Sequence, residues 1–544
     1  MREALTIFRK YYSSEHKSVD YVMNDLRLVL EARGDSIAVE ALDREVLAGQ
    51  RATLGNDSPA VAETLSRLSH NLVSQGKHAE AEAVCREELA LERTLSGSGN
   101  PNVAYSLHRL ADILYDQAKW AEAEAPCQEA IARFKQLAKD DPKRGGYAID
   151  LGHSQWRLAD VLAKTARRAQ AEQVRRAALQ VFEQAARDFP ADLYLRQEQA
   201  FSHRLLGDAL NELGRVDEAE GEQRAAIALY AELKAAAPTN PFYFQEEAYA
   251  TWMLAEMLEG AGRLDAAEAE YRHAIARHEK ASADFPNQAV LTERLGTIKV
   301  RLVELLSRRG RLPEAKAMYR EAAERGSASV LNALAWCLAT SGDPNLRDGT
   351  NAAVFAEKAV AETNRKHVGY LDTLAAACAE AGQFAKAISI QQEAIALSQS
   401  ELEKKDFASR LKLYEKNSPY RDHGSMAGLT RDRLVEGKFA EAEGLARECV
   451  ALREREIPDD WRTFNARSML GGALLGQKNY AEAEPLLRSG YKGMKQREGQ
   501  IPPIGKPRLK EVLQRLVQLY EETGRLDQAA EWRRKLAEFD KTEK

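Results

Sequence analysis

The sequence has few cysteines and no long apolar run. The first shortage argues against disulfide-rich and zinc-binding folds, and the second against a membrane span. Its five cysteines make no CxxC pair and no cysteine–histidine cluster at zinc-binding spacing; they are Cys85, Cys127, Cys337, Cys378 and Cys449. This scattered set excludes a disulfide framework or a zinc finger, and it suits a reducing compartment in which each thiol fills the core. No stretch reaches the roughly 18 apolar residues of a membrane span, and the start, MREALTIFRKYY, lacks the apolar centre of a signal peptide. We therefore expect a cytoplasmic location and no membrane insertion.

A basic excess and catalytic patterns are missing as well. The formal net charge is −5 over 544 residues, so the composition does not indicate a nucleic-acid partner. The ten histidines form no HExxH pair. The RDFP sequence at 187–190 faintly resembles a kinase DFG, but no HRD or glycine-rich loop accompanies it. The sequence thus predicts no enzyme, no metal site and no cofactor.

What the sequence does contain is an internal repeat. GRLDAAEAEYRHAIARHEKASADFP at 262–286 is nearly a copy of GRVDEAEGEQRAAIALYAELKAAAP at 214–238, and the interval from Gly214 to Gly262 defines a 48-residue unit. We take one alanine in each copy as a landmark, and it occurs at Ala81, Ala123, Ala171, Ala219, Ala267, Ala315, Ala352, Ala387, Ala442, Ala483 and Ala529. A twelfth copy has Val39 at this position.

Each copy carries two amphipathic stretches, which predict an antiparallel pair of helices, here called helix A and helix B. Helix A has a leucine at a fixed interval before the landmark, and this leucine occurs at Leu26, Leu68, Leu110, Leu158, Leu206, Leu254, Leu302, Leu374, Leu429, Leu470 and Leu516. The turn often holds glycine, which tolerates positive φ, as at Gly76, Gly214, Gly262, Gly310, Gly382 and Gly437. One pair cannot bury its apolar face alone, so the copies are expected to stack.

This pattern of leucine and a small residue, turn glycine and early helix-B alanine resembles the tetratricopeptide repeat. The resemblance implies an all-α fold, a right-handed α-solenoid of about twelve antiparallel helix pairs. The 42-residue copies, with DSPAVAETLSRL and GNPNVAYSLHRL, look like the longer kinesin-light-chain type. The 48-residue copies are expected to add about seven residues, or two turns, to each helix.

Changes in repeat length predict four subarrays. Residues 1–137 have 42-residue units, residues 138–325 have 48-residue units, residues 326–424 hold short units with an inserted loop at 341–349, and residues 425–544 form a C-terminal subarray with a cap. HGSMAG at 423–428 is expected to be a soft joint. Residues 1–9 align with 43–51, so the sequence is expected to open inside a helix B.

A stripe of acids and aromatics on the helix-A positions is the candidate partner-binding groove. One position, shortly after the helix-A leucine, faces the groove in the tetratricopeptide pattern, and here it reads His70, Asp112, Asp160, Asp208, Glu256 and Glu304. Nearby positions hold Trp156 and Trp252, and Tyr105, Phe201 and Tyr249. These positions differ by three or four residues and therefore share one helical stripe. Such a channel would attract a basic protein segment.

The stripe can also be structural. Arg109, Arg157 and Arg301 precede an acid of the stripe by three residues and Arg204 by four, so arginines within the same helix are expected to neutralise the acids. The aromatics can equally fill gaps between long helices. The groove asparagine of kinesin light chains is not matched, because Ser66 and His108 stand in its place.

The repeats favour a non-catalytic protein-interaction scaffold. The alternative is the sensory or docking arm of a bacterial serine/threonine protein kinase, because the 48-residue units and the run from DDWRTFNARSMLGG onward look like arrays appended to such kinases. The kinase motifs themselves are missing, so the chain would be a separated or truncated arm.

Overall fold

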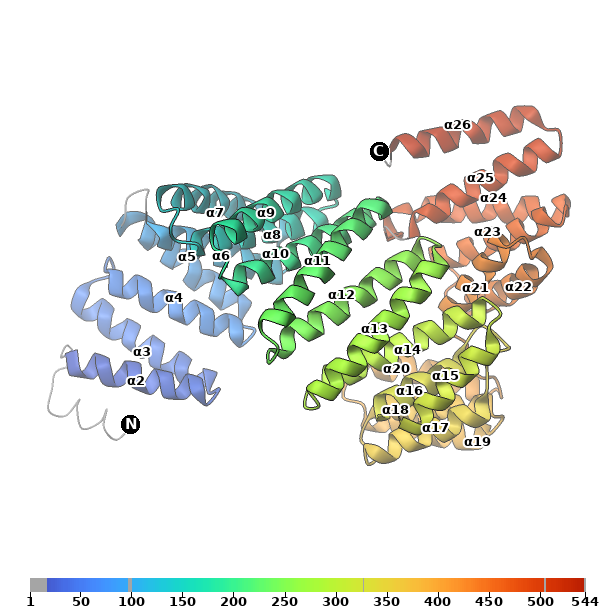
Figure 1. The fold of residues 1–544 in the computed structure, drawn as a ribbon, viewed down its shortest axis with the longest axis horizontal. Coiled ribbons are helices and arrows are strands. Elements are labelled where there is room, and N and C mark those ends of the chain that lie inside the picture. Colours follow the sequence, from blue (N-terminus) through green and yellow to red (C-terminus); the bar gives the residue numbers. More distant parts are fainter. Residues whose placement is uncertain (1–16, 96–99, 326, 503–504, 543–544) are drawn as a thin grey trace. The chain divides into compact units, whose positions relative to one another are not determined.

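The computed structural model describes residues 17–95, 100–325, 327–502 and 505–542, and these residues are almost entirely helical. Within them there is no strand, and no helix is long and apolar enough to cross a membrane. The helices form two compact units, residues 1–237 and residues 238–544, here the N-terminal and C-terminal units (Figure 1). The expected helix at residues 1–9 lies outside the described residues.

The described residues of the N-terminal unit form five helix pairs. They are α2/α3 (Lys17–Ala32, Ser36–Leu54), α4/α5 (Pro59–Ser74, His78–Leu95), α6/α7 (Pro101–Asp116, Trp120–Asp140), α8/α9 (Gly146–Lys164, Arg168–Asp188) and α10/α11 (Leu193–Glu212, Val216–Ala236).

The part of the C-terminal unit that the structure describes forms seven pairs, one unpaired helix and a short 3-10 turn. The pairs are α12/α13 (Pro241–Gly260, Leu264–Asp284), α14/α15 (Ala289–Arg308, Leu312–Arg325), α16/α17 (Ala328–Thr340, Gly349–Glu362), α18/α19 (Val368–Glu380, Phe384–Leu397), α21/α22 (His423–Val435, Phe439–Glu456), α23/α24 (Trp461–Gly476, Tyr480–Gln496) and α25/α26 (Pro507–Glu522, Leu526–Thr542), with α20 (Glu401–Tyr414) unpaired and η1 at Glu498–Gln500. The predicted twelve pairs are confirmed, whereas α20 was not predicted as a separate helix.

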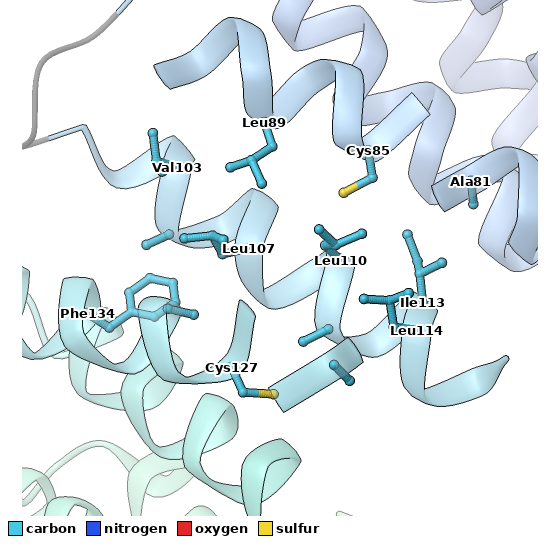
Figure 2. Close-up of a cluster of buried hydrophobic side chains, with 14 of the residues drawn as sticks. Ala81, Cys85, Leu89, Val103, Leu107, Leu110, Ile113, Leu114, Cys127 and Phe134 are labelled. Atoms are coloured by element: carbon cyan, nitrogen blue, oxygen red, sulfur yellow. The ribbon is translucent and has the colours of Figure 1, made fainter. Parts of the chain in front are cut away.

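The repeated leucine and alanine form the core, as predicted. All eleven landmark alanines are buried, and so are all eleven leucines of helix A. In Figure 2, Ala81, Cys85 and Leu89 of α5 lie against Leu107, Leu110 and Ile113 of α6, with Phe134 and Cys127 of α7 beyond them. Each pair therefore buries its apolar face against its neighbours in the stack.

The long repeats lengthen both helices by the predicted amount. Helices α10 and α11 have 20 and 21 residues, whereas α18 and α19 in a short repeat have 13 and 14. The difference is seven residues in each helix, which is close to two turns and keeps the buried stripe in phase.

The segment expected to be a soft joint is instead part of a helix. HGSMAG forms the first turns of α21, capped by the Asp422 side chain, and Met426 is fully buried. Two contacts hold the start of α21 against the end of α16. The backbone of Met426 packs against Gly342 in the inserted loop after α16, and the Asp422 amide donates to the Thr340 carbonyl over 2.7 Å. The chain thus returns after α20 to the end of α16.

A ladder of ion pairs joins successive repeats, and the sequence analysis did not find it. A glutamate one residue after the landmark accepts from a lysine or arginine four residues before the next landmark. The pairs are Glu40–Lys77, Glu82–Lys119, Glu124–Arg167, Glu172–Arg215, Glu268–Arg311 and Glu484–Arg525, at 2.6 to 3.3 Å. The sequence does contain a signal for this ladder, because the glutamate and the basic residue recur at the same two positions of the repeat. An alignment of the copies would have shown both.

Candidate functional site

The predicted stripe forms one continuous row of side chains in the N-terminal unit, on the helix-A face of α6, α8 and α10. Arg157 Nε of α8 donates to Asp112 Oδ1 of α6 over 2.5 Å. Arg175 Nη2 of α9 donates to Asp160 Oδ1 over 2.9 Å, and Gln223 Nε2 donates to Asp208 Oδ1 over 2.8 Å. Arg204 Nη1 lies 3.5 Å from Asp208 Oδ2. Acids and arginines therefore alternate along consecutive repeats.

The carboxylates of this row lie nearer to solvent than the arginines. The side chains of Asp112, Asp160 and Asp208 are 34%, 36% and 44% exposed. Those of Arg157, Arg175 and Arg204 are 25%, 13% and 12% exposed. A molecule approaching this face thus meets carboxylate oxygens first, although each carboxylate is partly neutralised from below.

Crowding by neighbouring repeats perturbs these carboxyl groups. Burial raises the pKa of Asp160, and the nearby charge of Arg175 opposes the rise. Burial likewise raises the pKa of Asp208, with Arg204 and Arg175 opposing it. Both carboxyl groups are therefore partly desolvated by the neighbouring helices, although part of each side chain still reaches solvent.

The predicted neutralisation within single helices is wrong for two of the four arginines. Arg157 pairs with Asp112 of the preceding repeat and not with Asp160. Arg109 Nη1 donates to Glu88 of α5 over 2.7 Å and not to Asp112. A long arginine can reach an adjacent helix as easily as the next turn, and spacing in the sequence shows only the second option. Arg204–Asp208 and Arg301–Glu304 do pair as expected, each at 3.5 Å.

Trp156 is part of an aromatic cluster between three helices. Its ring centroid lies 5.0 Å from those of Phe182 in α9 and Phe201 in α10, and 4.9 Å from that of His153. Phe182 is fully buried, so most of this cluster fills space between long helices. The tryptophan itself is half-buried.

The three remaining predicted residues, Trp252, Glu256 and Glu304, belong to the C-terminal unit. Trp252 packs edge-on against Tyr249 at 5.9 Å. Arg301 lies 3.6 Å from Glu256 and 3.5 Å from Glu304. Here the arginine is outermost, with half of its side chain exposed, while Glu304 is 20% exposed. In the C-terminal unit the arginine is therefore more exposed than the acid, whereas in the N-terminal unit the acids are more exposed than the arginines.

The helix-A face of the short repeats is covered by the chain itself. Every residue of α18 from 371 to 379 is buried. Arg410 of α20 donates to Asp372 over 2.9 Å and lies 5.4 Å from the Trp336 ring, on which Tyr420 also packs. Because its own later residues occupy this face, the short subarray offers no open stripe to a partner.

Side chains of the metal-binding types do not cluster in the described part of the chain. No group of three or more His, Cys, Asp or Glu side chains there could hold a metal ion. Two shallow hollows of about 390 and 330 Å³ lie between successive B helices, and ion pairs bridge them: Glu357–Lys386 at one and Arg272–Glu314 at the other.

Two family models match parts of the chain, and several solved structures are similar to it. Tetratricopeptide-repeat family models match residues 60–136 and 248–273. Kinesin-light-chain TPR-like repeats from Podosopora anserina are 20% identical, cover 41% of this chain and 99% of their own, and have a TM-score of 0.34. BtubC (BKLC) from P. vanneervenii is 18% identical over 45% of this chain and 89% of its own, with a TM-score of 0.33. The apo form of RapI is 10% identical over 65% and 98%, with a TM-score of 0.35.

No curated protein matches the sequence. The kinase-arm alternative therefore stays a prediction from sequence. The family models match within α4–α7 and α12–α13, and a buried leucine and a buried alanine recur in the other helix pairs. The variations are valine for the alanine in α2/α3, and an inserted loop that separates Leu334 from Ala352 in α16/α17. The chain carries tetratricopeptide repeats.

Proposed function

We propose that the chain is a non-catalytic scaffold that binds a basic segment of a partner protein on the helix-A face of its N-terminal unit. The observation that supports this is the row of Asp112, Asp160 and Asp208, whose carboxylates lie outside the arginines that partner them. For Asp160, one oxygen accepts from Arg175, and the other has no hydrogen bond within the described residues. It can accept one from a partner.

The other surfaces are less suited to this role. Ion pairs between repeats already occupy the outer side of the B helices, as in Arg44–Glu80 and Arg93–Glu129. The face of α18 is covered by α20 and Tyr420. The stripe in the C-terminal unit presents Arg301 first.

Spacing suggests how a basic segment would lie. Packed helices are about 8–10 Å apart, and a segment in the polyproline II conformation rises about 3.1 Å per residue with three residues per turn. Lysines or arginines at every third residue of such a segment lie on one side of it, about 9 Å apart, and would therefore meet successive carboxylates. The attraction is partly screened, with a Debye length of about 8 Å at physiological ionic strength, so affinity should fall as salt rises.

The test uses a fluorescein-labelled nonapeptide with lysine at every third position among glycine and serine, and a counterpart with norleucine for lysine. The face variant carries Asp112→Asn, Asp160→Asn and Asp208→Asn. We expect the lysine peptide to bind the parent in low salt, and the face variant to bind it about tenfold more weakly, a difference of about 1.4 kcal/mol.

The matched control removes three paired carboxylates from the B helices, with Glu87→Gln, Glu129→Gln and Glu218→Gln. These side chains are 53%, 36% and 51% exposed and each pairs with an arginine, so the change in net charge is the same. Control binding should stay within about twofold of the parent. Equal binding to the face variant and the parent, or equal binding of the norleucine peptide, would reject the proposal.

The five buried, unpaired cysteines suit a reducing compartment, and we place the protein in the cytoplasm on that ground. A disulfide between any two of them in protein isolated under alkylating conditions would contradict this.

A further inference from the structure

Two other carboxylates lie on the same helix-A face, and neither has a lysine or arginine partner among the described residues. Asp150 of α8 and Glu198 of α10 occupy the same position of the repeat, because Asp150 precedes Ala171 by the interval at which Glu198 precedes Ala219. Tyr105 Oη donates to Asp150 Oδ2 over 2.8 Å. Glu198 Oε2 lies 3.0 Å from His153 Nε2, and Gln197 Nε2 donates to Oε1 over 3.4 Å.

This differs from the row described above, in which arginines lie within 4 Å of each acid. No lysine or arginine nitrogen of the described residues lies within that distance of Asp150 or Glu198. Arg144 is nearby, but it stacks on the Tyr147 ring at 4.5 Å and donates to the Tyr147 hydroxyl over 3.0 Å. Glu198 is only 5% exposed, and a carboxylate so deeply placed ordinarily has a cationic partner.

Two buried polar groups close to these carboxylates have no hydrogen-bond partner in the described structure. The Ser202 hydroxyl lies one turn along α10 from Glu198, is 1% exposed and has no hydrogen-bond partner in the described structure. The indole Nε1 of Trp156 is buried and equally unpartnered. Because buried polar groups are normally satisfied, this region is incomplete on its own.

Aromatic rings border the two carboxylates. Tyr194 is 45% exposed; burial, followed by the neighbouring Glu198, raises its pKa to about 12. Tyr105 is half-buried beside Asp150, and Trp156 lies 4.9 Å from the His153 ring. Rings around a negative centre favour a cation, which is attracted by both the charge and the ring faces.

We propose that Asp150 and Glu198, bordered by Tyr105 and Tyr194, form a subsite for one lysine or arginine side chain of the bound segment. The inference rests on the function proposed above and names an anchoring point within it. Asp112, Asp160 and Asp208 attract the segment along its length, whereas Asp150 and Glu198 hold one of its cations.

The experiment compares three proteins with the same lysine nonapeptide by fluorescence anisotropy. The subsite variant carries Asp150→Asn and Glu198→Gln, which keep size and hydrogen bonding to Tyr105 and His153. The control carries Glu87→Gln and Glu129→Gln. We expect the subsite variant to bind about tenfold more weakly and the control to bind within about twofold of the parent.

A second variant, Tyr194→Ala, tests the subsite independently in case the Asp150/Glu198 variant does not fold. Tyr194→Ala changes a largely exposed ring and should weaken binding about two- to fivefold, as expected for loss of a cation–π contact. The Trp156 ring should report occupancy: the peptide should change the tryptophan fluorescence of the parent, and at the same peptide concentration this change should be largely lost in the variant that carries Asp150→Asn and Glu198→Gln.

The outcomes separate the two proposals. If the peptide does not bind the parent, both fail. If it binds, and the variant lacking Asp112, Asp160 and Asp208 binds weakly, but the Asp150/Glu198 and Tyr194 variants bind like the parent, the subsite is rejected and the proposed function survives.

Discussion

The five cysteine side chains illustrate how burial sets reactivity at the level of single residues. Each is at most 3% exposed, and burial raises the pKa of the Cys85 and Cys127 thiols to about 12. Burial also raises the pKa of Cys337, Cys378 and Cys449. Since the thiolate is the reactive form, the native protein should not react with an aromatic disulfide reagent at pH 8, and five thiols should react after unfolding. A native thiol that reacts as fast as free cysteine would contradict this packing.

Glu40 gives a prediction on pH at the same scale. Its hydrogen bond from Lys77, 2.6 Å long, lowers the pKa of the carboxyl from 4.5 to about 2. A depressed acid pKa stabilises the folded state fully above the unfolded value, and this stabilisation is lost as pH falls from about 4.5 toward 2. Glu40→Gln should therefore reduce amide protection of α3 and α4 at pH 7, and the difference from the parent should shrink below about pH 4.5. A difference that stays constant down to pH 3 would show that the ion pair contributes nothing.

The sequence predicts which acids share the stripe, but it does not predict which side chains pair with them. Helical spacing placed Asp112, Asp160 and Asp208 on one stripe, because residues three or four apart share a face. It could not show that Arg157 reaches Asp112, 45 residues away, since that contact depends on how helices of different repeats stack. Asp150 and Glu198 were missed because their significance lies in the absence of a cation, which only the structure reveals.

At the scale of the helix pair, the turn between helices sets a backbone requirement. Five residues before the landmark, φ is positive at eight glycines, such as Gly214 at 75°, and at three other residues: Ala118 at 58°, Ala166 at 61° and Lys478 at 62°. Each of these turns is closed by a bond back into helix A, as from Lys119 to the Leu114 carbonyl over 2.9 Å. The sequence showed this requirement wherever glycine stands and concealed it at the other three positions.

Ala118→Gly and Ala166→Gly should therefore stabilise their repeats. A side chain in the left-handed region costs about 1–2 kcal/mol, and the added freedom of glycine in the unfolded chain costs about 0.5–1 kcal/mol, so the net gain is up to about 1.5 kcal/mol. Gly214→Ala is the matched reverse change, because a Cβ there would touch nothing within 4 Å and the cost is purely that of the backbone. Thermal unfolding midpoints should rise for the first two variants and fall for the third; a fall for all three would reject the argument.

Helix pairing was predicted almost completely, since it depends on periodic apolar residues that repeat twelve times. The exception, α20, follows the short repeats and has few buried residues of its own, Phe407 and Tyr414 among them. It is held by contacts to other helices, such as Arg410 to Asp372, which no local pattern encodes. The same reason explains why HGSMAG, the start of α21, is predicted from the sequence as a joint and not as helix.

At the scale of the whole molecule, contacts run mainly between successive helices, as α10 with α9 and α11. Stability should then be a sum over neighbouring repeats and not a property of the chain as one body. The boundary between the two compact units lies between residues 237 and 238, inside the predicted subarray of 48-residue units at 138–325. Repeat length and packing therefore divide the chain at different places. The four subarrays stay a prediction from repeat length.

Leu206→Ala tests this regional stability. Leu206 is fully buried in α10, and its truncation should cost about 2–5 kcal/mol through lost burial and a residual cavity. Because α10 packs on α9 and α11, hydrogen exchange should accelerate in α9 to α11, while exchange in α23 to α26 of the C-terminal unit should match the parent. Leu516→Ala in α25, also fully buried, is the reciprocal control and should loosen the C-terminal end alone. If either change accelerated exchange equally in both units, the two would unfold as one cooperative body, and the nearest-neighbour description of this array would be wrong.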